Sequence, residues 1–369
     1  MNMVAIDLHI RNSFLHASSA GGELIRKGRI GNTLAEFAEF LAPLESEPMR
    51  VVMENTGNSR AMVHLLRRYA QDAGVALSAE ILDARKLRVI AESVSKCDRL
   101  DAAVLCELAC SNLKLPSIYV PDDEVFALRE HLRSRADLVR VRTMLKNRVH
   151  AALHRRGLWS PQADGLFTQA GLRWLKEVEF DAAGREIVDR YLSQIESMDA
   201  SLKSSTASVR KLSGQQRWCH PAALLCTIPG VGLITSMTIL AELGDVDRFH
   251  GRASVSNYAG LVPVLRSSNE KHYSGGITHR GPPALRSVLV EASWVAISRV
   301  PLYRSIYDRV ATRRGKQVAI VAVARRMLED SWIMLRRKQV FRITSASCGD
   351  VDRSEGSDVK RSINPSVAG

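Results

Sequence analysis

The sequence predicts an α/β unit with a mixed β-sheet at the start of the chain, followed by mainly helical sequence. Three short strand-like segments come first, at residues 3–9, 13–18 and 23–30. Strand-like segments at 50–54 and 75–82 then alternate with segments whose apolar residues recur at helical spacing. Three strands followed by alternating strands and helices are typical of a sheet that contains both antiparallel and parallel pairs.

The helical segments of this unit have recognisable ends. The helix that follows the third strand has Asn32 or Thr33 as its predicted N-cap. The amphipathic helix that begins near Ser59 is predicted to end at Gly74. Two further helices are predicted within residues 83–94 and 96–113.

Two long helices are predicted in the middle of the chain. Prolines at 116 and 121 interrupt the α/β pattern, and residues 124–157 then contain no proline. Residues 184–212 form a second stretch with apolar residues at three- and four-residue steps. The two stretches could pair as an antiparallel coiled coil, which suggests at least a dimer.

A third region begins with an apolar segment that contains Pro-Gly-Val-Gly at residues 229–232. This turn between two helical stretches is typical of a helix-hairpin-helix, whose exposed N–H groups suit a phosphate. A tight helix-packing turn is the alternative. The predicted domains are 1–118 (α/β), 119–218 (helical coiled coil), 219–342 (mainly helical) and 343–369 (disordered tail).

The charge of the chain predicts a polyanionic partner. The formal net charge is +13 and the pI is about 9.7, which favours nucleic acid over a membrane surface. Residues 129–156 hold nine Lys/Arg against two acidic residues, and residues 297–338 hold eleven against three. Because the six cysteines form no CxxC pair, and because no signal peptide or membrane-length apolar run is present, we expect a cytoplasmic protein.

Four acidic residues of the first unit are placed as a set by the predicted elements: Asp7, Glu54, Asp98 and Asp101. Asp7 and Glu54 close two apolar strands, where ligands tend to bind in open α/β sheets. Asp98 and Asp101 share one face at the start of a helix, where their charges would repel each other. Convergence of the four would be costly without a cation, and an all-oxygen ligand set favours Mg²⁺ or Mn²⁺.

These acids, together with Lys96 and the later segments "IPGVGLITSMTILAELGDVDRF", "YAGLVP" and "ALRSVLVEASW", resemble the DEDD transposases of the insertion-sequence one-ten family. The resemblance covers about residues 3–340. It implies a ribonuclease-H-like, RuvC-type catalytic domain, a C-terminal transposase domain and metal ligation by the four acids. It also implies a composite site formed by the two domains, which two subunits can share, and a structured bridge RNA that specifies donor and target DNA.

The resemblance also implies a serine nucleophile at Ser268, which would form a phosphoserine link to DNA and conserve bond energy for rejoining. Ser267 is adjacent, so the position is ambiguous by one residue. Two departures from the family pattern, Asn269 and Pro282, leave activity open. Ser274, His272 and His279 are weaker candidates for catalysis, and the predicted nucleic-acid contacts are Arg133, Arg140, Lys146, Arg148, Gly230, Gly232, Arg266, Arg280 and Arg286.

Three functions are consistent with these residues. The first is an RNA-guided DNA recombinase that uses the four carboxylates and the serine. The second is a metal-dependent, structure-selective DNA nuclease in which water replaces the serine. The third is a nucleic-acid-binding scaffold without turnover.

Overall fold

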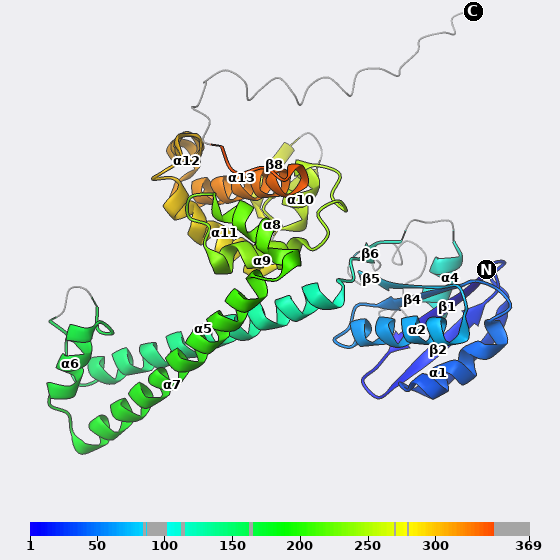
Figure 1. Cartoon of the computed structure of the whole chain (residues 1–369), viewed down its shortest axis with the longest axis horizontal. Helices are drawn as coiled ribbons and strands as arrows, with labels where there is room; N and C mark the ends of the chain where they lie inside the picture. Colours follow the sequence, from blue (N-terminus) through cyan, green and yellow to red (C-terminus); the bar gives the residue numbers. More distant parts are fainter. Residues whose placement is uncertain are drawn as a thin grey trace, which may run out of the picture. The chain divides into compact units, whose positions relative to one another are not determined.

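The structure, a computed structural model, describes residues 1–83, 86, 102–111, 115–161, 165–268, 271–278 and 280–342. It divides into two compact units, Met1–Pro121 and Asp122–Gly369 (Figure 1). Most of the helix predicted at 83–94, both ends of the helix predicted at 96–113 and the tail beyond 342 lie outside the described residues. The predicted boundary between residues 218 and 219 stays a prediction.

The first unit contains a six-stranded sheet in the order β3-β2-β1-β4-β5-β6. β1, β4 and β5 are parallel to one another, whereas β2, β3 and β6 pair antiparallel with their neighbours. The mixed α/β sheet predicted from the sequence is therefore confirmed. The strands are β1 (Asn2–Leu8), β2 (Asn12–Ser18), β3 (Leu24–Gly31), β4 (Met49–Glu54), β5 (Leu77–Leu82) and β6 (Ser117–Ile118).

Helices cover both faces of this sheet. α1 (Leu34–Leu41) and α2 (Ser59–Ala73) bury one face, and α4 (Ala102–Cys110) packs on the other; a 3-10 turn (Ala42–Leu44) follows α1. Thr33 caps α1 by accepting a hydrogen bond from Glu36 N, and Gly74 ends α2 at φ 68°. Both ends follow the sequence prediction.

The contacts of two cysteines show in which direction α4 runs along the sheet. The Cys106 thiol lies 3.6 Å from Met3 O, and the Cys110 thiol lies 3.8 Å from Ser19 O. Met3 is at the amino end of β1 and pairs with Ser18, next to Ser19. The C-terminal end of α4 therefore lies at the amino edge of β1, and its first residue, Ala102, points toward the carboxyl edge.

The second unit carries an arm made of α5 (Asp123–His154), α6 (Gln169–Glu177) and α7 (Ala182–Ser213). Arg142 pairs with Asp199 at 2.6 Å, and Arg135 donates to Thr206 Oγ1 at 3.1 Å. Because residue numbers rise along α5 as they fall along α7, the helices are antiparallel, and Figure 1 shows them side by side. Apolar side chains from both helices, Val149 and Val188 among them, form a core at the far end of the arm.

The rest of the second unit surrounds the long helix α13. Its helices are α8 (Gln216–Cys226), α9 (Leu233–Leu243), α10 (Arg252–Tyr258), α11 (Pro283–Ala296), α12 (Pro301–Arg314) and α13 (Lys316–Arg337). A hairpin of β7 (Pro263–Ser268) and β8 (Lys271–Ile277) interrupts them. The sequence prediction missed this hairpin and treated Ser268 as a loop residue, because serines and glycines dilute the strand pattern. Ser268 instead ends a strand, in register with Lys271.

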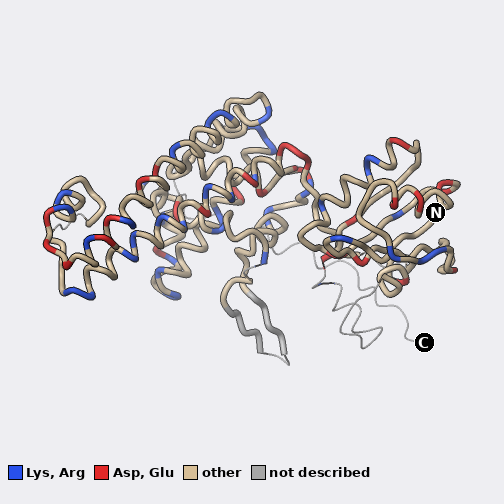
Figure 2. Tube along the Cα trace, turned by 90° about the horizontal axis from the view of Figure 1, so that it is seen from below, with Lys and Arg blue, Asp and Glu red and all other residues tan. Residues whose placement is uncertain are grey.

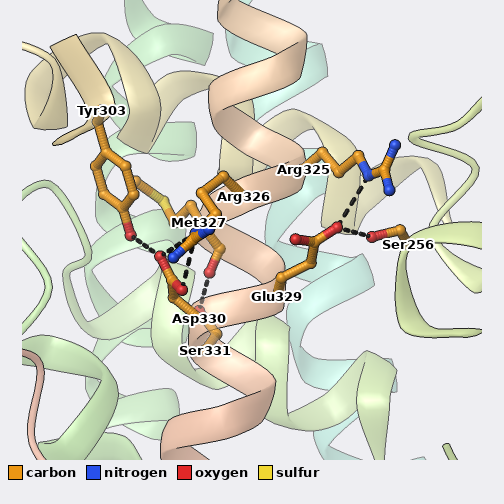
Figure 3. Close-up of polar contacts among 8 residues, drawn as sticks. All are labelled: Ser256, Tyr303, Arg325, Arg326, Met327, Glu329, Asp330 and Ser331. Carbon is orange, nitrogen blue, oxygen red and sulfur yellow. Dashed lines mark hydrogen bonds and ion pairs between the residues drawn. The ribbon is translucent and has the colours of Figure 1, made fainter. Parts of the chain in front are cut away.

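Two consecutive carboxylates tie α13 to different neighbours (Figure 3). Glu329, 8% exposed, accepts hydrogen bonds from Ser256 of α10 at 2.8 Å and from Arg325 at 2.9 Å. Asp330 accepts from Tyr303 of α12 at 3.0 Å and faces Arg326. Burial, and then the Asp330 charge, raise the pKa of Tyr303, so its hydroxyl stays a donor.

None of the described helices combines the length and apolar character that crossing a membrane requires.

Candidate functional site

Asp7 and Glu54 project from the same face of the sheet. Ala5 of β1 pairs with Val52 of β4, and both residues are buried under α4. Asp7 and Glu54 each lie two residues further along these parallel strands, so their side chains point to that same face. The sheet therefore brings together two of the four predicted ligands at its carboxyl edge.

The other two predicted ligands, Asp98 and Asp101, lie outside the described residues. Asp101 immediately precedes Ala102, the fully buried first residue of α4. Because α4 begins toward the carboxyl edge of β1, the chain enters the helix on the side of Asp7 and Glu54. Among the described residues no group of three His, Cys, Asp or Glu side chains could hold a metal ion. Metal ligation therefore stays a prediction that requires Asp98 and Asp101.

His9 is a neighbour of this edge that the sequence did not single out. Its Nε2 lies 3.3 Å from Asp7 Oδ2, and both side chains are about half exposed. The loop after β1 is held by side chains from two directions: Asn32 and Asn58 both donate to His9 O, at 2.7 and 2.8 Å. The one feature of the sequence that could have indicated His9 is its position two residues after Asp7.

The loop after β4 is also fixed by a side chain. The hydroxyl of Ser59, the first residue of α2, lies 2.8 Å from Glu54 O and 2.7 Å from Thr56 N. These contacts close the turn directly after Glu54. Both strand-end carboxylates thus precede turns that side chains hold by hydrogen bonds, exposed ones after β1 and partly buried ones after β4. Such turns give a ligand site a defined base.

The base of the β7–β8 hairpin is a close crossing of two backbone segments. Gly260 and Gly281 both have positive φ, +68° and +84°. An added Cβ would lie 1.9 Å from Arg280 O at Gly260, and 1.8 Å from Tyr258 O at Gly281. No side chain fits either space, so the crossing requires glycine at both positions.

Arg286 braces this crossing. One of its terminal nitrogens donates to three carbonyl oxygens, those of Ala259, Arg280 and Gly281, at 3.0–3.1 Å. Burial lowers the pKa of Arg286. The sequence predicted Arg286 as a phosphate ligand; the structure uses part of its guanidinium to hold the root of the hairpin that carries Ser268.

The two glycines of the Pro-Gly-Val-Gly turn differ in environment. Gly230 has φ +93°, and an added Cβ would lie 2.4 Å from Ala292 O of α11. Close helix packing therefore accounts for Gly230. Gly232 is exposed, is the N-cap of α9, and has open space around its Cα. Of the two, Gly232 keeps the geometry in which backbone N–H groups could receive a phosphate.

The predicted nucleic-acid contacts on the arm are surface residues with different neighbours. Arg133 and Arg140 form exposed pairs with Glu130 and Asp137 one turn away, which cost little to exchange for a phosphate. Lys146 lies 4.6 Å above the Phe167 ring, and Arg148 is exposed. Arg280 is also exposed; Arg266 is on β7, in register with Tyr273.

Two family models match the chain. A DEDD transposase model of the IS110 group matches residues 4–156, and the model described as Transposase IS116/IS110/IS902 family matches residues 222–308. Together they cover about two thirds of the chain. The matched residues include the two strand-end carboxylates and the β7–β8 hairpin.

Three relatives are informative. A protein of Sinorhizobium fredii named as transposase y4qE is 28% identical over 267 residues, 65% of each chain. The transposase for insertion sequence element IS1328 of Yersinia enterocolitica is 25% identical over 352 residues, 92% of this chain and 98% of the relative. The pilin gene-inverting protein of Moraxella bovis is 32% identical over 125 residues, 33% of this chain and 39% of the relative.

The first model covers the sheet with its two strand-end carboxylates, the second covers the hairpin, and both describe IS110-type transposases. The chain belongs to the IS110 family of DEDD transposases.

Proposed function

We propose that this chain cuts and rejoins DNA by forming a covalent link between Ser268 and a DNA phosphate. The carrying observation is the placement of Asp7 and Glu54 on one face of the sheet, at the edge toward which α4 begins. Asp98 and Asp101, just before α4, would complete a set of four carboxylates. The strand order, with β1 between antiparallel β2 and parallel β4, supports a ribonuclease-H-like domain.

The donor set fits a divalent cation. Asp7 is 41% exposed, so its carboxylate can reach a solvated ion, and carboxylate oxygens are the ligands that Mg²⁺ and Mn²⁺ prefer. Such an ion would stabilise charge on the phosphate oxygens. Asp7, Glu54, Asp98 and Asp101 would hold it, and the hydrogen-bonded turns after β1 and β4 would keep the first two in place.

The covalent step conserves the energy of the phosphodiester. The Ser268 oxygen forms a bond to phosphorus while the bond from phosphorus to a DNA oxygen breaks, and the serine proton is lost as the leaving oxygen gains one. Attack by the released oxygen of another strand would reverse the step and free the serine. Ser267 is the alternative nucleophile at the end of the same strand.

Several features support recombination over simple hydrolysis. The Moraxella relative is named for inverting a gene, which requires strands to be rejoined. The excess of Lys and Arg suits DNA and a structured guide RNA as partners. Because the carboxylates and Ser268 lie in different units, the site could also be completed between two copies of the chain.

Denaturing gels of the protein after incubation with Mg²⁺, labelled DNA carrying the element ends and RNA transcribed from the flanking DNA would test this proposal. We expect a protein–DNA adduct with wild type, and none with Ser268→Ala or Asp7→Asn, although both variants keep the wild-type circular dichroism. Retention of the adduct in Ser268→Ala and its loss in Ser267→Ala would transfer the role to Ser267.

Other outcomes would favour the alternatives. Free DNA ends at wild-type rate with Ser268→Ala would indicate a metal-dependent nuclease in which water attacks. Unchanged DNA in the presence of Mg²⁺ and RNA would indicate a scaffold. Unimpaired cleavage by Asp7→Asn and Glu54→Gln would contradict metal ligation at this edge.

A further inference from the structure

The far end of the arm carries a group of aromatic rings, here called the aromatic platform, made of the exposed His154 and Trp159 and the half-buried His150 and Phe167. Trp159 is 69% exposed, and its ring lies 4.9 Å from that of His154 at an interplanar angle of 32°. His150 lies 6.1 Å from His154 and meets Phe167 edge-on at 5.6 Å. The rings thus pack against one another, while the Trp159 side chain remains largely exposed to solvent.

The sequence that leads up to the platform is rich in cations. Residues 138–163 contain six Lys/Arg and no Asp or Glu. Lys146 lies one turn before His150 and 4.6 Å above the Phe167 ring, and Arg155 directly follows His154 and is exposed. Lys and Arg segments recur along the whole arm in Figure 2.

The cations of α5 differ in whether the protein itself engages them. Residues 129–156 hold nine Lys and Arg, seven of them in α5 and two, Arg155 and Arg156, directly after it. Six of the nine form ion pairs or hydrogen bonds with other residues: Arg129, Arg133, Arg135, Arg140, Arg142 and Arg156. Lys146, Arg148 and Arg155 form no ion pair among the described contacts, although Asp199 interacts electrostatically with Lys146. Lys146 and Arg148 lie in the last third of α5, and Arg155 directly follows it. The cations without an ion pair are therefore concentrated near the platform in the sequence.

We propose that the aromatic platform binds single-stranded nucleic acid by stacking an unpaired base on Trp159, while Lys146 and Arg155 contact the adjacent phosphates. Aromatic side chains stack on bases of any sequence, and cations beside them follow the backbone. A duplex hides its base faces, so it offers the phosphates but no stacking partner. The inference deepens the proposed function, on which its meaning for recombination rests, and assigns nucleic-acid binding to a part of the arm distant from Ser268 along the chain.

An acidic peptide or a second protein chain is the competing occupant, since Trp and Arg also dominate protein interfaces. Such interfaces have an apolar centre. Here the Trp159 ring lies beside that of His154, and Lys146, Arg148 and Arg155 precede it in the sequence, with Asp164 as the nearest acidic residue. The composition of this surface therefore favours a nucleic acid, which offers both phosphates and aromatic bases.

The test uses the full-length protein and fluorescein-labelled 20-nucleotide strands of single-stranded RNA, single-stranded DNA and duplex DNA, with fluorescence anisotropy at fixed salt. We expect Trp159→Ala to weaken single-strand binding about tenfold and to leave duplex binding within about twofold. Trp159→Phe, which keeps a stacking face, should restore most of the affinity. Comparison of RNA with DNA shows which strand the platform prefers, and preference for either supports the proposal.

The matched control is Trp294→Ala, because Trp294 is 47% exposed in α11 and lies outside the platform. It should bind all three probes like wild type. Intrinsic fluorescence gives a second measurement: bound single strand should quench wild type more than Trp159→Phe.

Wild-type single-strand affinity in Trp159→Ala would overturn the proposal, as would an equal loss for duplex and single strand. A change in molar mass by light scattering with unchanged RNA binding would assign the platform to a protein contact instead. Because Ser268→Ala should bind the strands normally, failure of the covalent mechanism and failure of the platform are distinguishable.

Discussion

The carboxylate of Asp181 stabilises the start of α7 in two ways. Oδ2 lies 2.5 Å from Arg156 Nε at the end of α5, and Oδ1 accepts a hydrogen bond from Gly184 N at 2.7 Å. The hydrogen bond from Arg156, and then that from Gly184, lower the pKa of Asp181 from 3.8 to about 2. One residue thus caps a helix and links both helices of the arm.

This pKa predicts a pH dependence of stability. The unfolded chain takes up the proton first as pH falls, so the contribution of Asp181 is complete above about pH 4 and is lost between about pH 4 and pH 2. We expect Asp181→Asn to lower the melting temperature at pH 6, and to show a smaller further decrease between pH 4 and pH 2 than wild type. Asp189→Asn, which removes an exposed pair with Arg185 on the same helix, is the control. Parallel curves for Asp181→Asn and wild type would contradict the assignment.

Single residues with a local physical signature could be predicted from the sequence. Thr33 and Gly74 were identified because a cap depends on a few neighbouring residues. The placement of Asp7 and Glu54 at the same edge of the sheet could be predicted because it required only that two buried strands be neighbours. The bracing role of Arg286 could not be predicted, since it depends on carbonyls up to 27 residues away. The same holds for His9, whose position depends on Asn32 and Asn58.

Among the elements, the β7–β8 hairpin combines the weakest sequence signal with the most restrictive anchoring. A strand pair reveals itself by regular alternation, and "VLRSS" and "KHYSGGI" alternate poorly. The long helices, by contrast, were predicted to within three residues at each end, because their apolar spacing continues over eight turns. The position of the hairpin is instead fixed at its base, where the backbones at Gly260 and Gly281 cross closely.

Gly281→Ala should therefore destabilise the second unit. The added methyl would overlap Tyr258 O, and φ +84° is unfavourable for alanine, so we expect a loss of more than about 1 kcal/mol in the free energy of unfolding. Gly276→Ala is the control: Gly276 lies on β8 with nothing within 4 Å of an added Cβ. Denaturant unfolding of both variants would measure this, and equal stabilities would show that the crossing relaxes easily.

At the level of the whole molecule, the mixed α/β sheet and the predominance of helices followed from the sequence, whereas the contact pattern did not. The sequence separated the middle helices from the C-terminal region, yet Val125 and Val209 of the arm lie in the same core as α8–α13. Apolar periodicity shows which face of a helix is buried but not which element buries it. The antiparallel pairing of α5 and α7 agrees with the prediction; the coiled-coil and oligomer assignments stay predictions.

The net charge of +13 predicts strong salt dependence of nucleic-acid binding. Each phosphate contact releases condensed counterions, so six or more contacts would weaken binding on the order of 10³-fold between 50 and 200 mM salt. Titration of a labelled strand by anisotropy at several KCl concentrations measures the slope. A neutral polymer probe is the control, and a flat response for the nucleic acid would contradict the role of the basic arm.

The length of α5 sets the distance between two parts of the second unit that could contact one nucleic acid. Its 32 residues span roughly 48 Å at 1.5 Å per residue. The helix runs from the core that contains Val125 to the aromatic platform at its C-terminal end. A strand in the stacked geometry of B-form DNA, with about 3.4 Å per nucleotide along the axis, needs on the order of 14 nucleotides to touch both ends, and a more extended strand needs fewer. Shorter oligonucleotides would occupy one end only, so affinity should step upward once that span is exceeded.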